Sequence, residues 1–302
     1  MVEAVITTLS GVLRLIPDRL PGKIRLGRML LRPFRSQAPA ILKDRAGCIY
    51  VMPSYAEPTA LYIFTFGAYE RDTQEVILKF LPETGTFIDV GANIGTLAIP
   101  IANARPQVSV ICIEADTNIH RFLQENVSQN GCERVQIVSC VAGPTDGQLV
   151  AFYRAPDDKF GMGSLGPQFC NVPIMLQQQS LDNMLTRMDI HQVDVIKIDV
   201  EGAEVGVLRG AQRLLASERP PTVVFEFADW AEARIPGQQP GDAQAFLLAS
   251  GYRLFRLERG GRIGEELLAP MRRGSCHATC GASGPARSAV NMRAKSCGLL
   301  AA

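Results

Sequence analysis

The sequence predicts an α/β fold in which helices cover both faces of a mostly parallel sheet. Apolar runs without polar alternation, typical of strands buried on both faces, occupy residues 86–90, 108–114, 135–140, 193–199 and 222–227. Segments with helical character separate them, at residues 94–103, 118–130 and 203–216. After a further helix at 242–250, two short runs at 252–257 and 263–268 are spaced closely enough for a hairpin. We therefore expect a seven-stranded sheet, parallel except for a C-terminal antiparallel hairpin.

The composition is that of an ordinary globular protein. The chain has 302 residues, of which 47% are hydrophobic and 20% charged, and its formal net charge is +1. Such a balance does not suit a protein that specialises in polyanions, so we expect no nucleic-acid partner. The sequence leaves open whether the chain forms a homo-oligomer.

Three parts are expected along the chain: a basic helical or mixed extension (residues 1–64), a catalytic α/β domain (65–270) and a basic tail (271–302). The extension should hold a strand near 48–52, and a helix over 73–81 should begin the domain. The tail has no acidic residue and no apolar periodicity, which predicts disorder.

Residues 1–35 carry seven Lys or Arg side chains and two acids, with apolar residues at helical spacing that Pro17 and Pro21 interrupt. We favour a helical lid or collar packed on the catalytic domain over a segment lying on an anionic membrane surface. The apolar residues are too interrupted for a signal peptide, so we expect a cytoplasmic protein, with the inner face of a membrane as the alternative.

The cysteines predict no metal centre. Five of them (Cys48, Cys112, Cys132, Cys140 and Cys170) are irregularly spaced and indicate thiols in a reducing compartment. In the tail, Cys276, His277 and Cys280 lack a second pair of ligands for zinc.

The first chemical motif is Phe-Ile-Asp-Val-Gly-Ala-Asn-Ile-Gly, residues 87–95, a strand that runs into a glycine-punctuated turn. Gly91 and Gly95 would permit the tight turn and the close approach of a ligand. Asp89 argues against a pyrophosphate and favours a ligand with an ammonium group. Glu114 ends the next strand, where a carboxylate can accept both ribose hydroxyls; its alternative role is a charge at a helix N-terminus.

The second motif places Lys197, Asp199 and Glu201 at alternate positions, so in a strand all three point to one side at its carboxyl end. Ligands of open α/β sheets bind at that edge. The residues alone leave two readings open, an ion pair that caps the strand and a site for an acceptor hydroxyl.

Together these motifs resemble the FkbM-family methyltransferases. The resemblance rests on residues 87–95, on Val-Ile-Lys-Ile-Asp-Val-Glu-Gly-Ala-Glu (195–204), on Val-Leu-Arg-Gly-Ala (207–211) and on Ser-Leu-Asp (180–182), and it covers residues 65–228. It implies a Rossmann-like class I methyltransferase fold, S-adenosyl-L-methionine as the cofactor, and O-methylation of a small molecule, sugar or glycolipid.

The resemblance also implies a set of site residues. The cofactor-binding residues would be Glu70, Asp89, Gly91, Asn93, Gly95, Glu114 and Ala115. For catalysis, we hypothesise that Asp199 is the general base or orients the nucleophile, Lys197 keeps Asp199 ionised or stabilises the alkoxide, and Glu201 shapes the acceptor site. Two departures from the family pattern are Thr96-Leu97 in place of an aromatic pair and Ala115 in place of a frequent proline.

Several rival functions receive less support. A nicotinamide oxidoreductase would need a third glycine, and a nucleic-acid amino-methyltransferase would need an Asn/Asp-Pro-Pro-aromatic loop. Asp199 and Glu201 could hold Mg²⁺, but no motif supplies another carboxylate, so no metal is expected. The remaining alternative is a non-catalytic binding or assembly module that keeps the cofactor fold and contacts a membrane through residues 1–35.

Overall fold

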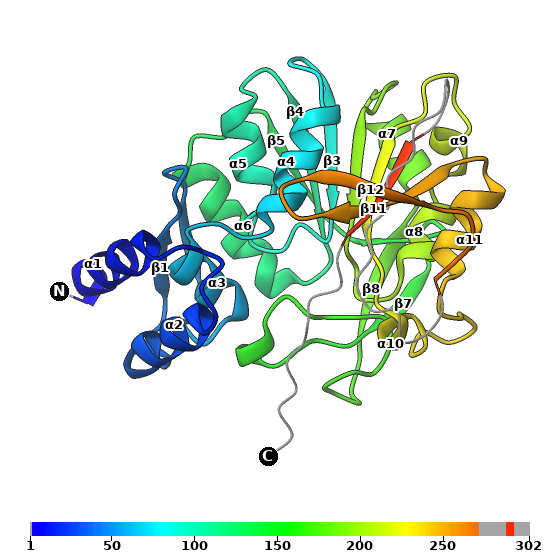
Figure 1. Ribbon diagram of the computed structural model, residues 1–302. Coiled ribbons are helices and arrows are strands. Elements are labelled where there is room, and N and C mark those ends of the chain that lie inside the picture. Colours follow the sequence, from blue (N-terminus) through cyan, green and yellow to red (C-terminus); the bar gives the residue numbers. More distant parts are fainter. Residues whose placement is uncertain (1, 272–287, 293–302) are drawn as a thin grey trace.

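The computed structural model describes residues 2–271 and 288–292, and its centre is a twisted sheet with helices on both faces (Figure 1). Five parallel strands form the middle of the sheet, in the order β10-β9-β3-β4-β5. Their bounds are β3 Thr86–Val90, β4 Ser109–Glu114, β5 Val135–Ser139, β9 Val195–Ile198 and β10 Thr222–Glu226. From β3 the chain adds β4 and β5 on one side, whereas β9 and β10 lie on the other side of β3. Open α/β sheets bind ligands at such a switch in strand order, here between β3 and β9.

The C-terminal end of the sheet is larger than the sequence predicts. The expected hairpin is present as β11 (Arg253–Glu258) and β12 (Arg262–Leu267), which pair antiparallel. A further strand, β13 (Ser288–Met292), lies between β10 and β11 and pairs parallel with both, so the sheet has eight strands rather than seven. The physical reason is that β10 would otherwise present an unpaired row of backbone groups. Apart from β13, the tail that we expected to be disordered and its Cys276, His277 and Cys280 lie outside the described residues.

Two apolar clusters fill the two sides of the parallel sheet. On one side, α7 (Leu181–Arg187), α8 (Glu204–Arg209), α9 (Gln212–Leu215) and α11 (Asp242–Ala249) pack on side chains such as Ile88 and Ile196. On the other side, α4 (Arg71–Phe80), α5 (Ala98–Ala104) and α6 (Thr117–Gln129) pack on Phe87 and Val195. Neighbouring strand residues point to opposite sides, so both faces need apolar side chains, and this is why the strands have no polar alternation.

The helix expected over 203–216 is broken into α8 and α9. Gly210 stands at the break, and a Cβ atom there would come within 2.1 Å of the carbonyl oxygen of Gly143. The close backbone contact accounts for glycine at this position.

A second, three-stranded sheet has the order β6-β8-β7 and was not predicted. It consists of β6 (Val141–Ala142), β7 (Leu149–Phe152) and β8 (Ile174–Gln179). The segment between β7 and β8, with the 3-10 turn η2 (Asp157–Lys159), crosses the carboxyl edge of the main sheet near Asn93. The sheet therefore carries a loop to the edge where the chemistry is expected.

The N-terminal extension packs on the catalytic domain through its inner faces, as the collar interpretation predicts. It contains α1 (Val2–Leu15), α2 (Lys23–Leu31), η1 (Arg32–Phe34), β1 (Ala40–Lys43), β2 (Ile49–Met52) and α3 (Pro58–Phe66). Ile6 and Leu13 of α1 are buried in a cluster that includes Phe122 of α6. The Asn126 side chain accepts from the backbone N–H of Val51 at 2.7 Å and so attaches β2 to α6. No helix of the described part has the length and apolarity needed to cross a membrane.

Candidate active site

Lys197 is the centre of a buried charge cluster at the carboxyl end of β9. Its ammonium lies 3.3 Å from Oδ1 of Asp89 and 3.5 Å from Oδ2 of Asp199, and it donates a hydrogen bond of 3.2 Å to the carbonyl of Gly91. Asp89 faces Lys197 directly across the β3–β9 ladder and has no exposed surface. The Lys197–Asp199 ion pair, one of the two interpretations of the motif, is thus present, and Asp89 shares the same ammonium.

Glu201 reaches the site by a route that the sequence did not indicate. Strand β9 ends at Ile198, so Glu201 lies in a turn and not on the strand. Its φ is +53°, a left-handed conformation that is rare for a glutamate, and its carbonyl accepts from the Ser164 hydroxyl at 2.8 Å. The predicted alternation thus holds for Lys197 and Asp199 but not for Glu201, whose position the turn determines.

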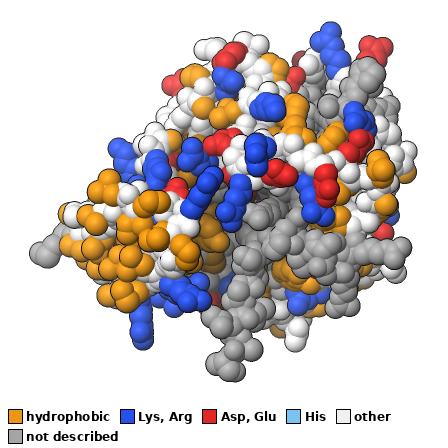
Figure 2. All heavy atoms as spheres, viewed as in Figure 1, with side chains coloured by type: hydrophobic (Ala, Val, Ile, Leu, Met, Phe, Trp, Pro, Cys, Tyr) orange, Lys and Arg blue, Asp and Glu red, His pale blue; other side chains and the backbone are white. Residues whose placement is uncertain are grey.

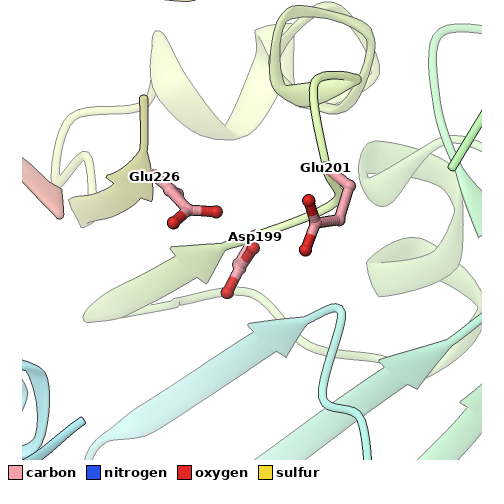
Figure 3. A group of neighbouring side chains, drawn as sticks. All are labelled: Asp199, Glu201 and Glu226. Atoms are coloured by element: carbon pink, nitrogen blue, oxygen red, sulfur yellow. The ribbon is translucent and has the colours of Figure 1, made fainter. Parts of the chain in front are cut away.

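A third carboxylate, Glu226, completes the group and was missed by the sequence analysis. Phe225 pairs with Ile198 in the β9–β10 ladder, so Glu226 follows at the level of Asp199. Carboxylate oxygens of Asp199, Glu201 and Glu226 lie within 4.8 Å of one another and point toward a common centre (Figure 3). A divalent cation prefers such oxygen ligands, so the argument that no further carboxylate is available does not hold.

Two glycines of the β3–α5 turn are required by contacts within the protein. Gly91 has a φ of +77°, and a Cβ atom on it would come within 1.9 Å of the carbonyl oxygen of Asp199. Gly95 has a φ of +87°, and its Cβ would meet side-chain atoms of Ile99 and Leu123 at 2.9 and 3.0 Å. The close approach that we expected toward a ligand is therefore, at Gly91, an approach of the turn to the end of β9.

Replacing Gly91 with alanine is expected to destabilise the fold strongly. The left-handed backbone alone costs an L residue about 1–2 kcal/mol, and the clash with the Asp199 carbonyl adds to that. Gly131→Ala is the matched control, because Gly131 also has a positive φ of +64° but open space around its Cβ position. In thermal unfolding, Gly91→Ala should lower the unfolding temperature clearly more than Gly131→Ala does. An equal decrease in the two variants would mean that the contact of Gly91 with Asp199 is not tight.

Glu114 connects the glycine turn to the start of α6. One carboxylate oxygen accepts the N–H of Asn93 at 2.9 Å, and the other accepts the N–H of Asp116 at 2.9 Å. Burial raises the pKa of Glu114 to about 7 despite these two hydrogen bonds. An ionised carboxylate has about four lone-pair sites, so two remain for a diol. Asp116 is the N-cap of α6 and accepts the N–H of Asn118, and since Glu114 accepts the N–H of Asp116, its carboxylate also lies at this helix N-terminus.

Predicted cofactor residues also gather around Asp89. Burial raises the pKa of Asp89, the Lys197 ammonium opposes this shift, and the neighbouring Glu70 carboxylate adds to it. Four non-glycine residues of the described part have a positive φ, and three of them, Glu70, Asn93 and Glu201, are predicted site residues. Strained backbone of this kind concentrates at functional sites.

Two cavities meet at these residues. A small one, of about 50 Å³, is bordered by Gly91, Glu114, Ala115 and Asp199 together with apolar side chains of the second sheet. A larger one, of about 490 Å³, lies between α2, α3 and the carboxyl edge of the main sheet. Its lining includes Tyr55, Tyr62, Tyr69, Phe160, Trp230, Asn93, Glu201 and Glu226. Glu201 and Gly161 border both cavities, so the two cavities are neighbours on either side of these residues.

Glu204 holds the turn that positions Glu201. One carboxylate oxygen accepts the N–H groups of Val200 and Gly202, at 3.1 and 3.2 Å. Burial, reinforced by the nearby Glu232 carboxylate, raises the pKa of Glu204 to about 8 from an ordinary value of 4.5. The folded protein thus keeps a proton that the unfolded chain releases.

A pH-dependent loss of stability follows from Glu204. Because its pKa is raised in the folded state, its contribution is complete below about pH 4.5 and is lost as the pH rises toward about 8. The unfolding temperature should therefore fall across this range, and it should fall less in Glu204→Gln, which keeps an acceptor oxygen but cannot ionise. Glu133→Gln, at an exposed position, is the control. The same slope in Glu204→Gln and in the unchanged protein would show that Glu204 is not the group responsible.

Comparisons with known proteins identify the family of this chain. The model of the methyltransferase FkbM domain matches residues 89–254, which is more than half of the chain. "Methyltransferase 1" of Beauveria bassiana is 25% identical over 147 residues, covering 43% of this chain and 59% of that protein. Ribosomal RNA small subunit methyltransferase G of Frankia alni is 37% identical over 94 residues, covering 31% and 30%. The 2-O-methyltransferase NoeI of Sinorhizobium fredii is 23% identical over 189 residues, covering 57% and 74%.

The chain spans only 59% and 30% of the lengths of the first two of these relatives. Among solved structures, a SAM dependent methyltransferase from Aquifex aeolicus matches with a TM-score of 0.38 and 15% identity, covering 69% of this chain and 90% of that chain. The family match includes Asp89, Glu114, Asp199, Glu201 and Glu226. This protein is accordingly a member of the FkbM methyltransferase family.

Proposed function

We propose that this protein transfers a methyl group from S-adenosylmethionine to a hydroxyl oxygen of a sugar, glycolipid or other polyhydroxylated small molecule. The observation that carries the proposal is the carboxylate group that borders both cavities, Asp199 on the smaller one, Glu226 on the larger one and Glu201 on both. A methyl donor on one side and an acceptor on the other would meet beside groups that accept hydrogen bonds.

The smaller cavity fits the nucleoside part of the donor. Glu114 keeps two acceptor sites for the ribose hydroxyls, and the apolar side chains of Phe152 in β7 and of Leu165 in the segment after it suit an adenine ring. At about 50 Å³ the cavity is smaller than a nucleoside, so binding requires residues 161–165, which border it, to move outward.

The methionine part fits the environment of Asp89. Apart from the contact with Lys197, neither carboxylate oxygen of Asp89 has a hydrogen-bond partner among the described residues, although the side chain is fully buried. An α-amino group placed there would relieve that deficit. Asn93, whose buried side-chain oxygen also lacks a hydrogen-bond partner among the described residues, offers a second acceptor.

The larger cavity suits a polyhydroxylated acceptor. Its volume of about 490 Å³ is in the usual range for small-molecule sites, and it combines aromatic walls with the carboxylates of Glu57, Asp158, Glu201 and Glu226. Carboxylates accept hydrogen bonds from hydroxyls, and aromatic faces cover the apolar side of a ring. Asp199 takes the hydroxyl proton or orients the oxygen, Lys197 offsets the negative charge, and Glu201 and Glu226 hold neighbouring hydroxyls.

When bound, S-adenosylmethionine supplies a methyl group on a positively charged sulfur. The chain's own contribution is to align the acceptor oxygen with that methyl group, to exclude water and to accept the proton.

The cellular setting is part of the proposal. None of the five described cysteines forms a disulfide, and four are buried, which supports a reducing compartment such as the cytoplasm. The acceptor is a small molecule or glycan and not a nucleic acid.

Titration calorimetry with S-adenosylmethionine and S-adenosylhomocysteine tests the donor half of the proposal. We expect micromolar binding, on the order of −8 kcal/mol. Formation of S-adenosylhomocysteine in the presence of sugars and glycolipid extracts then tests the acceptor half. A folded protein that binds neither compound would favour the non-catalytic module, and turnover on RNA alone would exclude the proposed acceptor class.

A further inference from the structure

Exposed apolar side chains concentrate on the N-terminal helices. Of the ten large hydrophobic residues that are exposed in the described part, five lie in residues 1–35: Val5, Val12, Leu15, Leu20 and Met29. Leu15 is 84% exposed and Met29 is 62% exposed. Figure 2 shows hydrophobic side chains gathered over this end of the molecule, with Lys and Arg side chains around them. Exposed apolar side chains that gather in this way on α1, α2 and the turn between them mark an interaction surface.

The same segment carries uncompensated positive charge. Arg19, Arg25, Arg28, Arg32 and Arg35 are all exposed, and none forms a salt bridge with another residue of the described part. The acid Asp18 is already paired, since Lys23 lies 2.6 Å and Arg45 lies 3.3 Å from its carboxylate. The surface therefore combines exposed apolar side chains with free arginines.

The helical repeat divides α2 and the turn after it into adjacent faces. Ile24, Arg28, Leu31 and Arg35 recur at intervals of three and four and line the larger cavity. Arg25, Met29 and Arg32 form the next stripe and face outward. The exposed surface and the cavity lining are thus neighbouring sides of one helix, so whatever covers the outer stripe lies at the mouth of the cavity.

We propose that the outward faces of α1 and α2 dock on an anionic lipid membrane and set the mouth of the acceptor cavity against it. The acceptor is then an amphiphile taken from the bilayer, with its polar headgroup in the cavity and an anionic group between Arg28 and Arg35. This substrate class deepens the proposed function and rests on it, because it takes the larger cavity as the acceptor site.

Charge complementarity favours a membrane over the other occupants. A nucleic acid would use the arginines but leave Leu15 and Met29 exposed to water. A second copy of this chain would meet the surface with the same surface, since two-fold interfaces are self-complementary, and would oppose arginines with arginines. An anionic bilayer accommodates both the exposed apolar side chains and the arginines. The apolar side chains enter the boundary of the acyl chains while the arginines contact the headgroups.

Cosedimentation with sucrose-loaded vesicles tests the docking. The full chain should bind vesicles of equal parts phosphatidylcholine and phosphatidylglycerol, and should bind pure phosphatidylcholine at least about tenfold more weakly. Raising the salt from about 0.1 M to about 1 M shortens the screening length from about 10 Å to about 3 Å and should release much of the protein. Inorganic phosphate at the same total charge should not compete, which distinguishes a lipid surface from a simple phosphate site.

Two double variants on the outward faces of α1 and α2, together with two single control variants elsewhere, locate the docking surface. Leu15→Glu combined with Met29→Glu should reduce vesicle binding about tenfold or more, as should Arg25→Gln combined with Arg32→Gln. Leu268→Glu, at an equally exposed position outside this surface, and Arg209→Gln should bind normally. All four proteins should keep their affinity for S-adenosylhomocysteine, so a failure here is separable from a failure of the proposed function.

The orientation of the larger cavity toward the membrane can be measured separately by tryptophan fluorescence. The chain has a single tryptophan, Trp230, and it lines this cavity. Anionic vesicles with brominated acyl chains should quench its fluorescence, and Arg28→Gln with Arg35→Gln should weaken the quenching more than the sedimentation. Sedimentation without quenching would overturn the placement of the cavity mouth. Equal binding to neutral and anionic vesicles, or a dimer that Met29→Glu abolishes in sedimentation velocity, would overturn the docking itself.

Discussion

Replacing Asp199 with asparagine is expected to slow methyl transfer by about 10²- to 10⁴-fold while the affinity for S-adenosylmethionine stays within a few fold. Asparagine keeps the size of the side chain but cannot take a proton. Asp199 borders the smaller cavity beside Glu201, which borders both cavities, and one of its carboxylate oxygens lies 3.5 Å from the Lys197 ammonium. The loss should therefore fall on kcat and not on donor binding.

Single-turnover formation of S-adenosylhomocysteine measures the rate of methyl transfer, and calorimetry on the same samples measures the affinity for S-adenosylmethionine. Asp189→Asn is a suitable control, since its side chain is 91% exposed and pairs only with His191 among the described contacts. Glu226→Gln supplies the decisive comparison. If Asp199→Asn turned over normally and Glu226→Gln lost the activity, the base would be Glu226, which lies in the same group of carboxylates.

Most of the fold could be predicted because burial on both faces leaves a direct trace in the sequence. Strand β3 has the predicted bounds, and β4, β5, β9 and β10 differ from the predicted runs by one or two residues at an end. The strands of the second sheet were not predicted because β7 is a half-buried run of only four residues and β8, Ile-Met-Leu-Gln-Gln-Gln, is half-buried and ends in three glutamines. Strand β13 comes after a stretch without apolar periodicity, and only its pairing with β10 and β11 defines it.

The site was predicted only where one motif contained its residues. Lys197, Asp199 and Glu201 belong to a single run, whereas Glu226 lies on the next strand in the sheet and was missed. A signal was present: like Glu114, Glu226 is an acid at the carboxyl end of an otherwise apolar strand. Acids at that position on adjacent parallel strands converge, because these strand ends share one edge of the sheet. The left-handed backbone conformation that places Glu201 at the site could not be predicted from a comparable sequence pattern.

Replacing Glu114 with alanine is expected to weaken the binding of S-adenosylmethionine and S-adenosylhomocysteine by about 10²- to 10⁴-fold, since two hydrogen bonds to a charged group contribute about 1.5–3 kcal/mol each. Glu114→Gln should also bind weakly, because its amide nitrogen would face the N–H of Asn93 or of Asp116. The exposed variant Glu133→Ala should bind like the unchanged protein.

The pH dependence of binding gives an independent check on Glu114. Its pKa is raised to about 7 in the free protein, and a ribose diol donates to the ionised form, so affinity should rise as the pH increases from about 6 to about 8. Glu114→Gln should lack this rise. If the variant kept full affinity and the same pH profile while remaining folded, the carboxylate would have only its structural role of holding the glycine turn against α6, and the ribose would have to be held elsewhere in the smaller cavity.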